Sequence, residues 1–171
     1  MNYETSLEIE IAVANWFGIR THIIVPNLSW AFMPYECDLV VLTKVGYLYE
    51  VEIKVSRSDL IRDKKKYKWA YMRHRTRKIW FAIPEKLAGS MEYIPQQAGV
   101  FIVDKNGHIT ELRKPEIDST AQKLSDRECF NVARLGAMRI WSLKKKLIKN
   151  DGRLEPVRKG ENDVQECDFI N

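Results

Sequence analysis

Three charged residues alternate with apolar residues in the stretch YLYEVEIKVS, residues 47–56, and their spacing could support chemistry. Side chains two residues apart share one face of a β-strand, so Glu50, Glu52 and Lys54 would project together from one side. The residues between them are apolar and would point into a core on the other side. The stretch therefore predicts a strand with one face for packing and one face for chemistry.

A fourth charged residue, Asp38, lies in the preceding apolar run CDLVVLT, residues 37–43. A turn at Lys44–Gly46 would join the two runs into an antiparallel hairpin, which places Asp38 beside Glu52. Two carboxylates ~4 Å apart repel by about 4 kcal/mol at an effective dielectric constant of ~20. A cation is therefore expected between them.

Lys54 supplies one positive charge, and Mg²⁺ is the metal that best suits the remaining negative charge. Mg²⁺ accepts one or two protein carboxylates and keeps several waters, and Mn²⁺ could substitute for it. Such a metal lowers the pKa of a bound water, and a pair of metals stabilises the attacking and leaving oxygens of a phosphodiester. Lys54 would orient the water or stabilise the developing charge. Asp38, Glu52 and Lys54 are therefore predicted to be catalytic, with Asp38 and Glu52 as metal ligands.

The alternative for these three residues is a cross-strand ion pair on a surface hairpin. For Glu50, two roles stay open: it could tune the site from behind the metal ligands, or lie at its edge.

Positive charge is concentrated in residues 57–78, which hold ten Lys or Arg and two Asp, a net charge of +8 against +5 for the whole chain. Basic residues interleaved with aromatic ones are typical of a surface that follows a phosphate backbone. A solvated basic helix is the alternative. The residues predicted to bind nucleic acid are Arg57, Arg62, Lys64, Lys65, Lys68, Arg73 and Arg75, with Arg57 a candidate for the scissile phosphate.

The hydrophobic periodicity predicts an α/β fold, with a mixed β-sheet sandwiched between helices. A first helix over residues 6–17 would begin at a Thr5 or Ser6 cap and end at Gly18. Apolar residues at helical spacing predict a long helix over residues 125–149. The other expected elements are a basic helix over 57–76 and strands over 21–25, 37–43, 47–55, 78–84, 98–104 and 108–114. One domain over residues 1–149 followed by a flexible tail over 150–171 is expected.

The composition argues against several classes of protein. No run approaches the ~20 apolar residues of a membrane span, and the acidic start MNYETSLEIE is unlike a secretory signal, so a cytoplasmic protein that does not contact membranes is expected. The three cysteines are far apart and form no CxxC spacing, which argues against a disulfide framework and a zinc site.

The sequence CDLVVLTKVGYLYEVEIKVS resembles the core of the PD-(D/E)XK nuclease superfamily. Asp38 corresponds to the first acid, and Glu52, Ile53 and Lys54 to the ExK element, while the proline of the superfamily's name is absent. The segments EIKVSRSDLIRD, WFAIPEKL and IPQQAGVFIVD extend the likeness to the MmcB-like branch, with its phage relatives, over residues 5–149.

This resemblance implies a restriction-endonuclease-like fold and a role in DNA repair or phage DNA metabolism, with DNA as the partner. It also implies that the main-chain carbonyl of Ile53 and a glutamate on the first helix bind the metal. Glu8 is the expected glutamate, and Glu4 is the alternative. Relatives are often dimers, and a homodimer is compatible with the sequence.

The function predicted from the sequence is Mg²⁺-dependent hydrolysis of DNA phosphodiester bonds, structure-specific or nonspecific. A catalytically silent nucleic-acid-binding module of the same fold is the first alternative, and it would be expected to lack one of Asp38, Glu52 or Lys54. A scaffold protein is the second alternative, and it would not need acids and a lysine clustered in a core hairpin. The presence of all three residues favours the nuclease.

Overall fold

A computed structural model describes residues 5–28, 36–64 and 75–149 of the chain. It divides the chain into two compact units, Met1–Ala137 and Met138–Asn171, which are described separately below. The expected tail over residues 150–171 lies outside the described residues.

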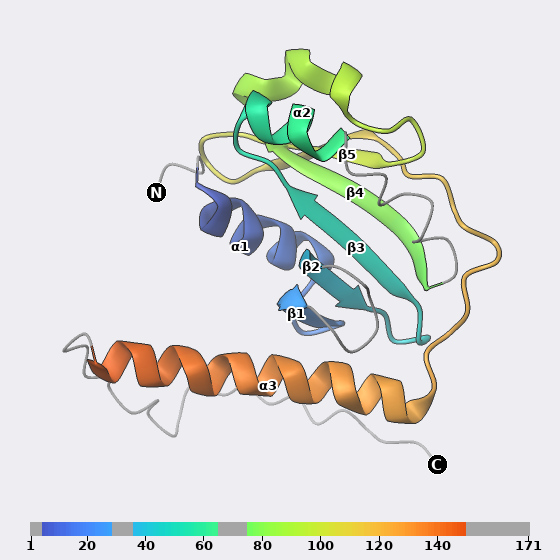
Figure 1. Cartoon of the computed structure of the whole chain (residues 1–171), viewed down its shortest axis with the longest axis vertical. Helices are drawn as coiled ribbons and strands as arrows, with labels where there is room; N and C mark the ends of the chain where they lie inside the picture. Colours follow the sequence, from blue (N-terminus) through green and yellow to red (C-terminus); the bar gives the residue numbers. More distant parts are fainter. Residues whose placement is uncertain (1–4, 29–35, 65–74, 150–171) are drawn as a thin grey trace. The chain divides into compact units, whose positions relative to one another are not determined.

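The first unit is built on one six-stranded sheet in which the strands lie side by side in chain order (Figure 1). The first three strands pair antiparallel, β3, β4 and β5 run parallel, and β6 returns antiparallel to β5. Parallel neighbours need crossover connections, which α2 (Arg57–Lys64) and the 3₁₀ segment η2 (Glu85–Tyr93) lie within. The strands are β1 (Ile23–Leu28), β2 (Cys37–Leu42), β3 (Leu48–Ile53), β4 (Thr76–Pro84), β5 (Gly99–Val103) and β6 (Ile109–Arg113).

Helix α1 (Ser6–Phe17) covers one face of this sheet. Its N-terminus is fixed by a capping box, in which the Thr5 side chain accepts a hydrogen bond from the Glu8 amide and the Glu8 carboxylate accepts one from the Thr5 amide. It ends at Gly18, whose φ of 86° suits glycine. The buried core on this face comprises Ile9, Ala12, Val13, Leu39, Val51, Ile53, Trp80, Ala82, Phe101 and Val103.

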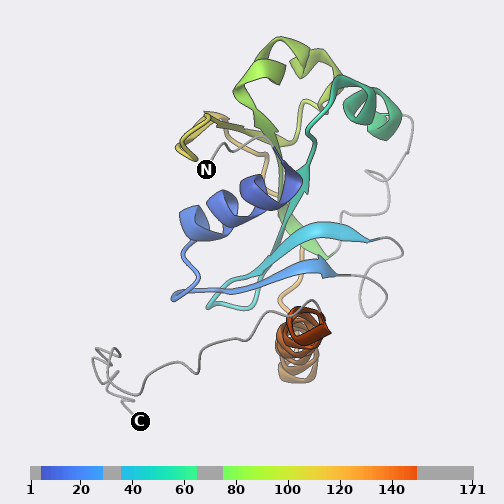
Figure 2. The ribbon, with the colours of Figure 1, turned by 90° about the vertical axis from the view of Figure 1, so that its left-hand side faces the viewer.

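The opposite face of the sheet is covered by α2 and η2 and by the first half of α3 (Asp126–Lys149) (Figure 2). Leu60 of α2 packs against Phe81 and Ile83 of β4. Val132 of α3 packs in a second cluster, over β1, β2 and the start of β3. These helices complete an α/β arrangement with a mixed sheet between helices, as predicted, and the open sheet is consistent with a restriction-endonuclease-like fold.

The strand and helix limits agree with the sequence-based expectations at most positions, including both ends of α1 and the C-terminal end of α3. The first strand was expected over residues 21–25, but β1 runs to Leu28, because Pro26 is tolerated in an edge strand. The basic helix was expected to end at residue 76. That limit is wrong, because Thr76 is the first residue of β4. The 3₁₀ segment η2 was not anticipated.

Within the three described stretches, none of the helices combines the length and apolar character that a bilayer crossing requires.

Candidate active site

Both faces of β3 are buried, including the face that carries the acids. Val51 and Ile53 pack under α1, as the alternation predicted. Glu50 and Glu52 point to the other face, yet only 0% and 1% of their surfaces are exposed. Lys54, just past the end of β3, is also largely enclosed, with 11% of its side chain exposed. An ionised side chain in such a place needs an opposite charge or hydrogen bonds nearby, so this is not a solvated strand face.

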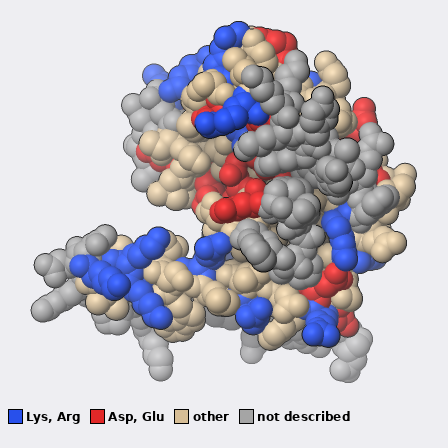
Figure 3. Space-filling view, viewed as in Figure 1, with Lys and Arg blue, Asp and Glu red and all other residues tan. Residues whose placement is uncertain are grey.

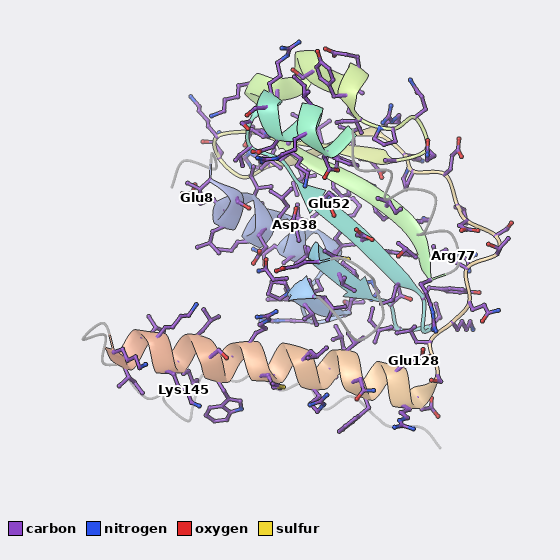
Figure 4. The ribbon with its side chains drawn as sticks, viewed as in Figure 1. Glu8, Asp38, Glu52, Arg77, Glu128 and Lys145 are labelled. Atoms are coloured by element: carbon purple, nitrogen blue, oxygen red, sulfur yellow. The ribbon has the colours of Figure 1, made fainter. Side chains whose placement is uncertain are left out.

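The β2–β3 hairpin brings Asp38 to Glu52. Leu39 pairs with Val51 and Val40 with Glu50, and continuing this register by one residue places Asp38 opposite Glu52. Oδ2 of Asp38 accepts a hydrogen bond of 2.8 Å from the main-chain amide of Ile53. The last described pair of β2 and β3 at this end is Leu39 with Val51, and this side-chain hydrogen bond links the two strands just beyond it. Figure 4 shows Asp38 and Glu52 near each other at this end of the β2–β3 hairpin, and acidic side chains reach the surface of the first unit (Figure 3).

Lys54 links the two acids. Its Nζ lies 2.5 Å from Oε2 of Glu52 and 3.3 Å from Oδ2 of Asp38, the oxygen that also bonds the Ile53 amide. Burial lowers the pKa of Lys54, but the surrounding carboxylates outweigh burial, and the pKa is raised above its ordinary value. The ammonium group is therefore fully charged at neutral pH.

A third carboxylate, Asp63 of α2, completes the surroundings of the lysine. Its Oδ1 lies 3.9 Å from Lys54 Nζ, and 4% of the side chain is exposed. Asp63 is one helical turn beyond the buried Leu60, so both face the sheet. Asp63 was not predicted as a site residue; it was one of the two Asp in the basic segment 57–78. Its spacing from Leu60 was the signal that it faces inward.

The start of α2 places Asp63 at this distance. Ser56 accepts a hydrogen bond of 3.2 Å from the amide of Asp59, and the hydroxyl of Ser56 donates one of 2.7 Å to the Asp59 carboxylate. The capping residue Ser56 lies three residues after the end of β3, and α2 begins at the next residue, Arg57. The short connection holds the helix against the charged face of β3.

On α1, Glu10 lies close enough to Asp38 for the two charges to interact. Burial and the neighbouring charge of Asp38 raise the pKa of Glu10 above its ordinary value. The predicted ligand Glu8 lies at the N-terminal end of α1, where Oε2 is 2.9 Å from the Thr5 amide and 2.7 Å from its hydroxyl (Figure 4). Glu4, the alternative, lies outside the described residues. Glu10 was not among the predicted site residues, because helical periodicity alone does not show which flank of α1 meets Asp38.

The charges of this cluster leave room for a cation. Asp38, Glu52 and Asp63 place three carboxyl groups around the one ammonium group of Lys54, and Glu10 and Glu50 lie on the adjoining elements. Across the described ranges, however, no three His, Cys, Asp or Glu side chains are grouped closely enough to hold a metal by themselves. Two carboxylates with a main-chain carbonyl and waters suit Mg²⁺, which seldom uses a complete protein cage. Asp38 and Glu52, with the Ile53 carbonyl that the resemblance implies, would make a ligand set of this chemical kind.

The predicted nucleic-acid-binding residues fall into two groups. Those that the structure describes have partners within the chain: Arg57 lies 4.9 Å from the centre of the Tyr93 ring, Arg62 pairs with Asp59, and Arg75 lies 2.5 Å from Glu128. For Lys64 only the main chain is described. The remaining predicted residues lie outside the described residues, and they are Lys65, Lys68 and Arg73.

Comparison with known proteins agrees with this architecture. One similar solved structure is the SPO1766 protein of unknown function from Silicibacter pomeroyi, with a TM-score of 0.58 and 19% sequence identity. The similarity covers 84% of this chain and 90% of the other, and at this identity it bears on the fold alone. No curated protein matches the sequence. A family model described as DNA repair protein MmcB-like matches residues 2–146, which is most of the chain. The protein therefore belongs to the MmcB-like family of DNA repair proteins.

Proposed function

We propose that this DNA repair protein is a Mg²⁺-dependent deoxyribonuclease of the PD-(D/E)XK type, which hydrolyses phosphodiester bonds in a structure-specific or nonspecific manner. The observation that carries the proposal is the arrangement at the end of β3, where Asp38 and Glu52 converge on the buried Lys54. A purely structural ion pair needs one acid for one base. Three acids around one lysine leave an excess of negative charge that suits a divalent cation.

Each residue has a role that follows from its position. Asp38 and Glu52 would hold the metal with the carbonyl of Ile53, and Glu10 is the α1 carboxylate placed to assist them. Bound Mg²⁺ would supply an activated water and stabilise the charge that develops on the phosphate. Lys54, fully protonated at neutral pH, would donate hydrogen bonds to the attacking water or to a phosphate oxygen. Asp38 is oriented for this role before any ligand arrives, because the Ile53 amide fixes one of its oxygens.

Cleavage assays test the proposal directly. The purified chain would be incubated with single-stranded, duplex, flap and junction DNA in Mg²⁺, in Mn²⁺ and in EDTA. We expect cutting that requires metal and that falls at least a hundredfold in Lys54→Ala and Asp38→Ala. Lys44→Ala is the matched control, because Lys44 is an exposed lysine in the β2–β3 turn. Metal-independent cutting, or equal activity in all three variants, would contradict the assignment.

A catalytically silent DNA-binding module is the second candidate, and one observation favours it. Lys54 already contacts both predicted ligand oxygens, Oδ2 of Asp38 and Oε2 of Glu52, so a metal must compete with the lysine for them. Calorimetric titration with Mg²⁺ and Mn²⁺ separates the candidates. The nuclease predicts binding that Asp38→Ala removes, whereas the silent module predicts equal, weak binding in wild type and variant.

A further inference from the structure

The second half of α3, Met138–Lys149, is strongly basic and solvent exposed. Every residue of this stretch is exposed, and it carries five cations and no carboxylate. The cations are Arg139, Lys144, Lys145, Lys146 and Lys149. In the described part of the chain, no carboxylate lies within ion-pairing distance of the four lysines, unlike Arg57, Arg62 and Arg75. Figure 3 shows this basic surface on the half of α3 that leads to Lys149.

Four of the five cations share one side of the helix. At about 100° per residue, Arg139, Lys145, Lys146 and Lys149 fall within an arc of about 120°. We call these four residues the α3 basic face. The first and last of them are ten residues apart, or about 15 Å along the helix axis at ~1.5 Å per residue. One DNA strand carries a phosphate every ~3.4 Å along the duplex axis, so the face matches the length of about four phosphates.

Helix stability does not explain the whole face. Cations stabilise a helix C-terminus through its dipole, but only within the last turn, which here holds Lys146 and Lys149. Arg139 lies about two turns before Lys146, outside the last turn. Lys145 and Lys149 are four residues apart, and like charges at that spacing destabilise an isolated helix by a few tenths of a kcal/mol. A polyanion bound along the face would remove this repulsion.

We propose that the α3 basic face binds the sugar-phosphate backbone of a nucleic acid, as a contact surface additional to the carboxylate cluster and to residues 57–78. The inference rests on the DNA-directed role given under the proposed function, but it does not depend on cleavage. It assigns phosphate recognition to a helix whose lysines form no ion pair with a carboxylate of the described residues. Contacts of this kind carry no base specificity, which agrees with structure-specific or nonspecific action.

A membrane surface is the other polyanion that an amphipathic helix could meet, since Ile140, Trp141 and Ile148 are 56%, 63% and 70% exposed. Lys144 argues against it. It lies four residues after Ile140 and four before Ile148, in the middle of the apolar side, and its Nζ is 5.1 Å from the centre of the Trp141 ring. Insertion of that side into lipid would bury the ammonium group. The nucleic acid is therefore the partner that the charges favour.

The salt dependence of DNA binding tests the inference with the full chain. The variant is Lys145→Gln, Lys146→Gln and Lys149→Gln combined. The control variant removes the same charge elsewhere through Lys44→Gln, Lys105→Gln and Lys114→Gln, three exposed lysines of the first unit. Binding of a fluorescent duplex would be followed by anisotropy between 50 and 200 mM NaCl in EDTA, where no metal-dependent cutting occurs. Circular dichroism would confirm equal helix content.

If each lysine neutralises one phosphate, the slope of log K against log [salt] becomes shallower by about 2.7 in the α3 variant, at ~0.9 per contact. The control variant should change the slope by less than about 1. Equal slopes for wild type and the α3 variant, or an equal change in both variants, would overturn the inference. Loss of binding to anionic vesicles with DNA binding unchanged would also overturn it and assign the face to lipid. A wild-type chain that binds DNA with the expected slope change but never cuts it would refute the nuclease and leave this inference standing.

Discussion

Replacing Lys54 by methionine is the sharpest test of the site as a buried charge cluster. Methionine keeps most of the side-chain volume and removes the positive charge. Glu52 and Asp63, whose side chains are 2% and 4% exposed, would then lie beside each other without their shared cation. Removing one partner of a buried ion pair destabilises a protein by about 3–5 kcal/mol. Native proteins have about 5–15 kcal/mol of stability, so Lys54→Met should lose a large part of it.

The free energy of unfolding would be measured by urea denaturation at pH 7 in EDTA, and the loss should lower Tm by roughly 6–20 °C. The double variant Lys54→Met with Glu52→Gln should recover part of the loss, because it removes one of the stranded charges. Adding Mg²⁺ at a hundred times its Kd should stabilise wild type by about 2.7 kcal/mol through linkage. Lys78→Met, at a partly exposed lysine of β4, serves as a control for the substitution itself. An unfolding free energy of Lys54→Met within about 0.5 kcal/mol of wild type would refute the reasoning.

Three further outcomes are expected. Asp63→Asn should lower kcat for DNA cleavage with little change in KM, because Asp63 holds the lysine and does not touch DNA. Asp63→Glu should keep part of the wild-type kcat. A raised KM with unchanged kcat would argue for a DNA-contacting role instead. Glu10→Gln should raise Tm at pH 7 and leave it unchanged near pH 3. The reason is that a carboxylate with a raised folded pKa favours the folded state below its unfolded pKa and loses that contribution as the pH rises through its folded pKa. A Tm difference that does not vary with pH would contradict this. Gly99→Ala should destabilise the fold by about 1–3 kcal/mol in urea denaturation, because an added Cβ would lie 2.4 Å from Cδ1 of the Trp80 ring; unchanged stability would mean that the ring moves aside.

The parts of the fold that local chemistry determines were predictable from the sequence. The capping box at Thr5 and the positive φ at Gly18 set both ends of α1, and both are readable from residue types. Alternation over residues 47–55 gave the correct inward face of β3, and the KVG turn gave the hairpin that brings Asp38 to Glu52. These features depend on neighbours in sequence, so a single sequence carries them.

The rest depends on tertiary packing. The burial of Glu50 and Glu52 follows from the packing of other elements against this face of the sheet, which no residue of β3 reveals. Asp63 and Glu10 enter the site from two helices on opposite faces of the sheet, and their spacing from Asp38 is a property of helix–sheet contact. Pro26 remained within a strand because β1 is an edge strand, and edge position is not visible until the strand order is known.

The amide of Ile53 gives Asp38 a main-chain partner, and this has a consequence for how the site meets a ligand. A carboxylate held only by other side chains would have to lose rotational freedom at the moment of binding, which weakens affinity. Here the orientation is set when the sheet forms, so the ordering cost of this side chain belongs to folding. Substitution by glutamate would keep the charge yet displace the oxygen by one methylene group. At this position, reach matters as much as charge.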